Sequence, residues 1–505
     1  MQIRRLFIKD YKLLKDFTIE FPYDFKKYIS VFIGTNGSGK STILEAIAEI
    51  FSSVFLNEKA KFGFELEYSV RHEYISEETS TTAESNVSYL SLKLSANKKG
   101  DNIQFETYDR FGQISVATEI LEKDKMVFVD RTTTYSYLPD NVVVYYSGLS
   151  NIMQKLVEPH NNLISASYRK NTALVDRDFF YFEPEHFGII LTSLLSFEYG
   201  DIPEFLERKA KIAGVQSIKI TLQRPEWAND TIQNFWGAKG EVRNFLDYLN
   251  ENSATIADLS NPENSTKTGN IVIEAWQDEA IIITIVTQER LFEIRNQLME
   301  ERKLFEILNV LHADGMLKDI KFSLKKVGSE QQQNFGVFSE GEQQAIIIKG
   351  LTELLSKKNS LFLFDEPDTY LHPKWQRQFI TDIENTIDSS FTSENSFVIA
   401  THSPQLLSNA KSELNFVKII EGGELIENTP KYYGREINSI LYDLMGVKER
   451  NKIVRDKISD LFTLIAEEEI DDAEISLKEL EELIGKDDPE LKRAEIQITY
   501  LKEDE

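Results

Sequence analysis

Cysteine is absent from the 505-residue chain, and histidine occurs only six times. The chain therefore has no disulfide, no thiol nucleophile and no thiolate ligand for zinc, and its scattered histidines predict no structural zinc site. No apolar run reaches the ~18 residues of a membrane-spanning helix. The opening stretch, MQIRRLFIKDYKLL, lacks the apolar core and cleavage site of a secretory signal. These absences predict a soluble, cytoplasmic protein with no membrane partner.

Positive charge is scarce as well: 57 Lys and Arg residues stand against 83 Asp and Glu residues, for a net charge of −26. Proteins that wrap nucleic acid need clustered Lys and Arg to bind its phosphates. The charge balance therefore excludes a surface that binds nucleic acid over most of its area, but it leaves a local basic groove and direct DNA contact open. The length is too great for one ordinary core and predicts two or three lobes.

Hydrophobic patterning predicts an α/β protein in four parts. We expect residues 1–150 and 319–430 to be the two halves of one α/β domain, a mixed sheet with a β-meander lobe. Residues 151–318 mix helical and strand-like stretches, which predicts an α+β insertion. Residues 431–505 predict an acidic helical appendage, because amphipathic stretches there are rich in Glu and Asp.

Local sequence patterns predict individual elements within these four parts. The opening residues predict two strands around a turn and residues 62–120 predict a β-meander, whereas 259–270 is typical of a polar loop. The stretch NFVKIIEGGELIENTP, at 415–430, predicts a β-hairpin. The three helices of the appendage are expected at 451–467, 470–484 and 488–501.

The stretch GTNGSGKST satisfies the pattern G-x-x-x-x-G-K-[ST] between a predicted strand and a predicted helix. Glycines let backbone N–H groups turn toward a phosphate chain, and the start of the following helix adds positive potential. In such a loop Lys40 is placed to bridge the β- and γ-phosphates, and the Ser41 hydroxyl to bind Mg²⁺. The candidate nucleotide-binding residues are Gly34, Thr35, Asn36, Gly37, Ser38, Gly39, Lys40, Ser41 and Thr42.

Two further strands end in residues suited to phosphate chemistry. In LFLFDEPDTYLHP a buried strand ends at Asp365, at the edge where open α/β sheets bind ligands. The Asp365 carboxylate is a candidate Mg²⁺ ligand, and the Glu366 carboxylate a candidate to polarise the attacking water. The stretch SFVIATHSP places His402 at the tip of another strand. We predict catalytic roles for Lys40, Glu366 and His402.

A second anion site is predicted in FSEGEQQAIIIKG. Ser339 and Gly341 begin a helix there, so that its first turn offers free backbone N–H groups. Ser339, Gly341 and Glu342 are therefore further candidates for contact with nucleotide phosphate.

The order of these motifs resembles the ATP-binding-cassette ATPases, in the branch that contains the SMC proteins, RecF and the OLD-type proteins. By this resemblance, residues 34–42 are the Walker A loop and residues 338–342 the signature motif. Residues 365–366 are likewise the Walker B motif, residues 367–371 the D-loop and His402 the switch histidine. The resemblance implies an ABC-ATPase cassette that binds and hydrolyses ATP with Mg²⁺.

In this family the signature of one subunit serves the nucleotide of another, which implies a homodimer or a higher even oligomer with shared ATP sites. γ-Phosphate then closes the interface, and hydrolysis releases it. Two positions depart from the family pattern. Glu340 stands where the family often has glycine, and no glutamine directly follows the strand VVVYYSG, Gln154 being the first after it.

The tail, over most of residues 400–500, resembles the PtuA-type ATPases of Septu anti-phage systems and of some retrons, which act with an HNH nuclease. The stretches that carry the resemblance begin with YYGREINSILYDLMGV and AEISLKELEELIGK. It implies a sensor or regulatory ATPase that controls a nuclease, with a retron reverse transcriptase and its DNA as further candidate partners. The apolar stripe of the tail is explained equally by docking of the partner and by packing on the cassette.

Two other functions stay open. A RecF-like repair ATPase would need a basic groove, for which ERKAK and EERK in the insertion are candidates. An OLD-like ATPase acting as a nuclease by itself would need a Toprim domain after the last motif. Only Glu421, in IIEGG, superficially resembles the opening of that domain, and fewer than ninety residues follow it. An intrinsic nuclease is therefore not expected.

Overall fold

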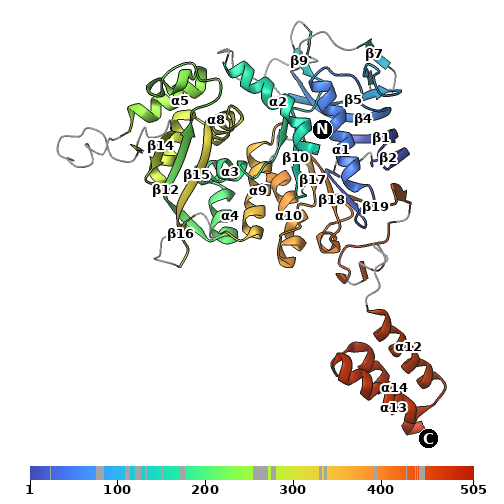
Figure 1. Cartoon of the computed structure of the whole chain (residues 1–505). Helices are drawn as coiled ribbons and strands as arrows, with labels where there is room; N and C mark the ends of the chain where they lie inside the picture. Colours follow the sequence, from blue (N-terminus) through green and yellow to red (C-terminus); the bar gives the residue numbers. More distant parts are fainter. Residues whose placement is uncertain are drawn as a thin grey trace. The chain divides into compact units, whose positions relative to one another are not determined.

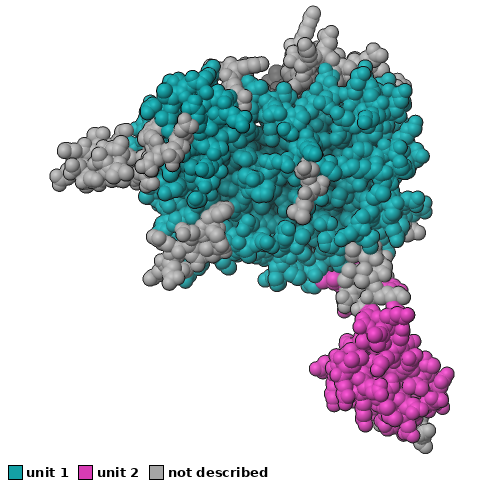
Figure 2. Space-filling model, in the orientation of Figure 1, with its two compact units in different colours: residues 1–434 teal, residues 435–505 magenta. Residues whose placement is uncertain are grey.

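The computed structural model describes residues 1–504 with gaps (Figure 1). Outside the description are residues 23, 25, 76–84, 109–113, 120–126, 131–132, 149–151, 170–176, 254–270, 275–279, 329–332, 335–337, 390–394, 428, 438, 441, 443–449 and 505. The predicted loop at 259–270 lies among them. The chain forms two compact units, residues 1–434 and 435–505, which Figure 2 shows in different colours.

A seven-stranded sheet lies at the centre of the first unit. Its order is β11 (Phe179–Tyr181), β10 (Asn141–Tyr146), β17 (Ser360–Asp365), β18 (Ser396–Thr401), β3 (Ile29–Ile33), β19 (Asn415–Glu421), β20 (Glu424–Ile426). Neighbouring strands are parallel except in the β19–β20 hairpin, which the sequence predicted. Strands β3, β10, β17 and β18 are buried almost throughout, as the apolar runs of a sheet covered on both faces require. The predicted α/β fold is confirmed.

A six-stranded antiparallel sheet and helix α1 (Lys40–Phe55) form the second layer. The sheet order is β2 (Leu14–Glu20), β1 (Gln2–Tyr11), β4 (Phe64–Ile75), β5 (Ser85–Ala96), β6 (Gln104–Tyr108), β7 (Ile114–Glu119). These strands confirm the predicted opening hairpin and β-meander. One hydrophobic cluster joins side chains of this sheet, of α1 and of the central sheet, so α1 is buried on nearly every side. A separate hairpin pairs β8 (Val127–Asp130) with β9 (Thr133–Ser136).

A five-stranded antiparallel sheet with helices around it lies mostly within the predicted insertion (Figure 1). The strand order is β13 (Ile271–Glu274), β14 (Ala280–Ile285), β12 (Ile212–Gln223), β15 (Leu317–Lys326), β16 (Gln333–Asn334). The predicted boundary at 318 is too early for this sheet, because β15 and β16 pair with the strands of the insertion, whereas β11, inside the predicted insertion, joins the central sheet. The helices are α2 (Ile152–Arg169), α3 (His186–Leu195), α4 (Asp201–Ala210), η1 (Ile232–Gly237), α5 (Gly240–Glu251), α7 (Gln288–Leu298) and α8 (Glu301–Ala313). The helical stretch QERLFEIRNQLMEERKLFEIL is two helices, because Met299 adopts a left-handed conformation (φ 68°) that ends α7.

The remaining helices of the first unit follow the sequence motifs. They are α9 (Glu340–Leu354), which begins at the signature-like stretch, α10 (Pro373–Ser389) and the short η5 (Pro404–Leu407). Helix α9 packs against α3, α4, α8 and α10. It therefore joins the insertion to the cassette.

The second unit is a three-helix bundle with its own core. Its helices are α12 (Lys452–Ala466), α13 (Ile470–Ile484) and α14 (Pro489–Asp504), as predicted to within three residues at each boundary. The apolar stripe of the tail, including Ile458, Leu461 and Leu480, is buried inside this bundle. The stripe therefore holds the unit together, and only apolar side chains outside it are free to meet other surfaces.

Candidate functional site

The candidate site lies at the carboxyl ends of three neighbouring strands. Strand β3 leads into the loop 34–42, β17 ends at Asp365, and β18 leads into His402; their order in the sheet is β17-β18-β3. Parallel strands present all their carboxyl ends at one edge, which is where ligands of open α/β sheets bind. The fold thus gathers the candidate catalytic residues from segments more than 300 residues apart in sequence.

The loop 34–42 presents its tip to solvent and keeps its lysine inside. Thr35, Asn36 and Gly37 are exposed, whereas Ser38, Gly39 and Lys40 are buried. The Lys40 ammonium donates hydrogen bonds to the backbone carbonyls of Gly34 (2.9 Å) and Thr35 (2.8 Å). Burial lowers the pKa of Lys40, while the carboxylates of Glu366 and Asp365 work in the opposite direction. An ammonium whose partners are neutral carbonyls gains by exchanging them for phosphate oxygens, so the loop suits ATP.

The β19–β20 hairpin contacts this loop through its turn. Its two-residue turn, Gly422 and Gly423, has positive φ at both positions (57° and 87°), as tight hairpins with the right twist require. The Gly423 N–H donates to the Ser38 carbonyl (2.8 Å). The turn also packs closely on the β1–β2 hairpin, because a Cβ on Gly423 would lie 2.7 Å from the Leu13 carbonyl oxygen. The stretch EGGE therefore has a structural role here, as a brace for the loop 34–42.

The contact between Gly423 and Leu13 can be tested by substitution. Gly423→Ala introduces a methyl group into the Leu13 backbone, so the turn has to move and take Ser38 with it; we expect ATP to bind at least about tenfold more weakly. Gly422→Ala is the matched control, because Gly422 also has positive φ but a Cβ there meets nothing within 4 Å. Isothermal titration with ATP should separate the two variants. Equal loss in both would show that turn strain, rather than the brace, controls the loop.

Asp365 has the character of a cation ligand. The residue is 1% exposed, and neither carboxylate oxygen has a hydrogen-bond partner of ordinary geometry among the residues that the structure describes. Burial raises the pKa of Asp365 to about 7, against the opposing influence of the nearby Ser41 hydroxyl and the Lys40 ammonium. A buried carboxylate without a partner is unfavourable unless a cation joins it. Asp365 and Ser41 thus fit a Mg²⁺ ion, which would neutralise phosphate charge when bound.

Glu366 and His402 form a pair beside Asp365. Glu366 has a left-handed backbone (φ 50°), and its N–H donates to the Ala400 carbonyl (2.8 Å), which turns its side chain away from the strand. Its Oε1 lies 3.1 Å from His402 Nδ1. This contact holds the pKa of Glu366 below its usual value and raises the pKa of His402. The carboxylate therefore stays ionised, in the form that accepts a proton from water.

The first turn of α9 is exposed at Ser339 and closed by a capping box. The Ser339 hydroxyl accepts a hydrogen bond from the Glu342 N–H (3.3 Å), and the Glu342 carboxylate accepts one from the Ser339 N–H (2.8 Å). Glu342 is therefore occupied within the turn. Within the described part of the chain, no hydrogen bond or ion pair joins this turn to residues 34–42. A single chain does not bring Ser339, Gly341 and Glu342 to its own phosphate-binding loop through such bonds.

Two polar residues at the same edge are not among the predicted site residues, although Asp368 falls within the stretch 367–371 that the resemblance assigns to the D-loop. Asp368 is 1% exposed and accepts a hydrogen bond from the Thr401 hydroxyl (2.8 Å), which ties the segment after β17 to the end of β18. Ser147, just beyond β10, donates its N–H to the Asp365 carbonyl (3.3 Å). Asp368 lies within the stretch that the resemblance assigns to the D-loop, whereas nothing in the local sequence distinguishes Ser147. Its position follows from the pairing of β10 with β17.

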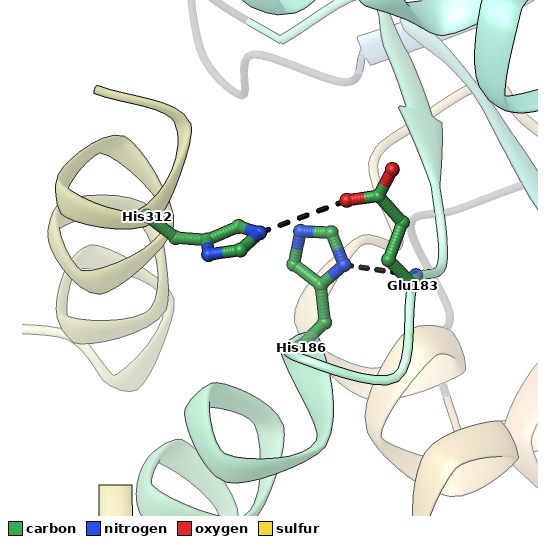
Figure 3. A group of neighbouring side chains, drawn as sticks. All are labelled: Glu183, His186 and His312. Carbon is green, nitrogen blue, oxygen red and sulfur yellow. Dashed lines mark hydrogen bonds and ion pairs between the residues drawn. The ribbon is translucent and has the colours of Figure 1, made fainter. Parts of the chain in front are cut away.

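A Glu–His–His cluster lies outside this site, between the β11–α3 turn and α8 (Figure 3). Ligand atoms of Glu183, His186 and His312 lie within 4.8 Å of one another. However, His186 Nδ1 accepts the Glu183 backbone N–H (2.9 Å), so its Nε2 carries the proton and donates to Asn309 (3.1 Å). Burial lowers the pKa of His186 to about 3. Because both ring nitrogens of His186 are hydrogen-bonded, His186 is a structural residue. Gln154, the first glutamine after the strand VVVYYSG, bonds Glu183 of this cluster.

Comparison with known proteins agrees with the geometry of the site. A family model described as "AAA ATPase domain" matches residues 1–407, which is most of the chain. The chain belongs to this AAA ATPase family. The ATPase is also 23% identical over 442 residues to "Retron Vc95 probable ATPase" of Vibrio cholerae, a match that covers 83% of the chain and 73% of the relative. ATP binding and hydrolysis are therefore its activity.

Solved structures similar to the ATPase include the SMC head domain from Thermotoga maritima, with 11% identity, 85% coverage of this chain, 100% of that chain and a TM-score of 0.29. Another is the ADP conformation of MJ1267, an ATP-binding cassette of an ABC transporter, with 11% identity, 88% and 96% coverage and a TM-score of 0.28. Among the described residues of the ATPase, no helix combines the length and the apolar character needed to cross a lipid bilayer.

Proposed function

We propose that this ATPase is the regulatory subunit of a bacterial anti-phage complex, acts in the cytoplasm and controls an HNH-type nuclease partner. The observation that carries the proposal is its similarity to a retron-associated probable ATPase along most of the chain. The resemblance of the tail to PtuA-type ATPases supports a nuclease as the controlled partner. A retron reverse transcriptase and its DNA are the further partners that such a system would bring.

The ATP site of this proposal is shared between two chains. One chain supplies the loop 34–42, the catalytic residues Lys40, Glu366 and His402, and the Mg²⁺ ligands Ser41 and Asp365. The other supplies Ser339, Gly341 and Glu342 to the γ-phosphate. Ser339 and Glu340 are exposed, as a tip that meets another subunit must be. The result is a homodimer, or a higher even oligomer, whose closure depends on γ-phosphate.

The second compact unit is the proposed docking surface for the nuclease. It has a hydrophobic core of its own, because its apolar stripe is buried in its own bundle. Acidic residues outnumber basic ones in it, and four large apolar side chains remain exposed on α13 and α14: Ile475, Leu483, Ile496 and Tyr500. Exposed apolar side chains among acidic ones suit a partner with a basic rim around an apolar centre.

The proposal is tested by removing residues 435–505 from a chain co-expressed with the HNH nuclease encoded beside it. We expect capture of the nuclease to fall at least about tenfold, while ATP hydrolysis stays within about twofold, since the first unit keeps its core. Ile475→Ser with Leu483→Ser in the full-length chain is the milder variant, because both side chains are exposed and leave the bundle intact. Undiminished capture, or loss of the cassette's solubility on truncation, would contradict this assignment.

Three of the five basic side chains in the two stretches that a RecF-like groove would use form ion pairs within the chain. Arg208 and Lys209 on α4, and Lys303 on α8, each form an ion pair with an acidic side chain. Lysines and arginines whose charge is already matched attract a DNA backbone less strongly. These ion pairs therefore weaken the support that the two stretches give to the DNA-repair alternative.

A further inference from the structure

Helix α9 contacts the Tyr370 backbone at both its N–H and its carbonyl group. The Tyr370 N–H donates to the side-chain Oε1 of Gln344 (2.9 Å). The Tyr370 carbonyl lies against Gly341, where a Cβ would come within 2.9 Å of its oxygen. Gly341 and Gln344 lie one turn apart on the same face of α9, the helix that begins at Ser339. The tip of α9 therefore contacts the backbone of one residue, Tyr370, on both of its flanking peptide units, in the segment that follows Asp365 and Glu366.

Gln344 is built into this contact from its other side as well. Its Nε2 donates to the Tyr145 hydroxyl (3.2 Å), and the residue is 2% exposed. Tyr145 lies in β10 beside β17, so the Gln344 amide spans from the central sheet to Tyr370. A buried amide with both ends bonded fixes a distance more tightly than apolar packing does, because either bond lost leaves a polar group unsatisfied.

The segment that Gln344 grips has independent support. The Leu371 N–H donates to the Asp368 carbonyl (3.0 Å), as does the Gln376 side chain (2.9 Å). The Thr369 hydroxyl donates to the Glu366 carbonyl (2.9 Å). These bonds hold the segment in shape without Gln344. The α9 tip, in contrast, contacts the segment through Gln344 and Gly341. The loss of Gln344 displaces the tip more than it displaces Glu366.

We propose that Gln344 is a positioning residue that acts in trans: through the Tyr370 backbone it aims the tip of α9 at the nucleotide held by a second subunit. The inference rests on the shared ATP site proposed above. It also gives Gly341 a second reason to be glycine, since any side chain there would push the tip off the Tyr370 carbonyl. ATP binding to the chain's own loop does not involve Gln344.

Gln344→Met keeps the volume and removes both hydrogen bonds. We expect the purified variant to bind ATP with unchanged affinity at its own loop but to hydrolyse it at least about tenfold more slowly. Tyr145→Phe removes one of the two bonds and should slow hydrolysis about threefold; it also serves if the Met variant does not fold. Unchanged turnover in both folded variants would overturn the proposal.

Mixed dimers separate an action in trans from one in cis. Gln344→Met mixed with Lys40→Ala forms one composite site with an intact loop and an intact tip, so activity should appear on mixing, at about a quarter of the wild-type rate for random pairing. Gln344→Met mixed with Ser339→Ala leaves every tip defective and should stay inactive. Ser339→Ala mixed with Lys40→Ala tests the shared site itself. Recovery of activity in this control but not in the mixture of Gln344→Met with Lys40→Ala would show that Gln344 acts in cis, and would overturn this proposal while leaving the shared site intact. Recovery in neither mixture would overturn the shared site itself.

Discussion

Glu366→Gln should leave ATP bound and almost unhydrolysed, with turnover reduced by about 10²–10⁴-fold. The substitution keeps the size of the side chain but removes the carboxylate that His402 holds ionised 3.1 Å away. ATP affinity should persist because Lys40 and the loop 34–42 are untouched. The γ-phosphate that would normally be released then stays in place, so the variant should accumulate as a dimer. Steady-state phosphate release and light scattering with and without ATP measure both effects.

Glu421→Gln is the matched control. Glu421 ends β19 in the same sheet and is exposed, but it belongs to the hairpin that braces the loop rather than to the β17–β18 edge. We expect wild-type turnover from it. The same variant tests the nuclease alternative, because a Toprim-like role would make Glu421 essential for metal-dependent DNA cleavage by the purified chain. A Glu366→Gln protein that stays monomeric and turns over normally would remove Glu366 from the chemistry.

Lys40→Ala should nearly abolish ATP binding, with a loss of about 2–4 kcal/mol, or roughly 30- to 1,000-fold in Kd. The Lys40 ammonium is buried and satisfied by the neutral carbonyls of Gly34 and Thr35, so it is the charge that the loop holds ready for phosphate. Removing it should raise stability slightly or leave it unchanged in the absence of nucleotide, since an unfavourable buried charge is lost. Titration with a non-hydrolysable ATP analogue gives the affinity.

The control for this variant is Lys98→Ala, which removes an exposed lysine in the turn between β5 and β6. Affinity for ATP should not change there. Wild-type ATP binding by a folded Lys40→Ala protein would refute the assignment of the loop 34–42 as the phosphate cradle.

Local sequence patterns predicted much of the fold because they report on burial. The apolar runs YISVF, LFLFD and SFVIAT predict strands covered on both faces, and the structure buries β3, β17 and β18 accordingly. The helices at 451–467 and 470–484 were equally visible, because their apolar residues recur at helical spacing. The sequence left open whether their apolar stripe packs on the cassette or on a partner. The buried residues of the stripe do neither, because they pack against one another inside the bundle. Three short helices that share one stripe can bury it among themselves.

The parts of the candidate site that depend on distant pairing could not be predicted. The Gly422–Gly423 turn is recognisable as a hairpin, yet its hydrogen bond to Ser38 exists only because β19 pairs with β3. The Gln344 bonds likewise join residues 26 and 199 positions apart, and nothing near Gln344 in sequence points to either partner. The role of Gly341 as a contact for the Tyr370 carbonyl was hidden for the same reason. Motif spacing predicts chemistry at strand ends, whereas side-chain bridges between elements require the assembled sheet.

The position of β3 between β18 and β19 also has a consequence during synthesis. A ribosome adds about 5–20 residues per second, so the five residues of β3, four of them apolar, wait roughly 20 to 70 s before their first neighbouring strand emerges. Until then this apolar segment has no strand to pair with, and the loop 34–42 of an unfinished chain lacks its brace. Full affinity for ATP is therefore reached only after translation has passed the β19–β20 hairpin.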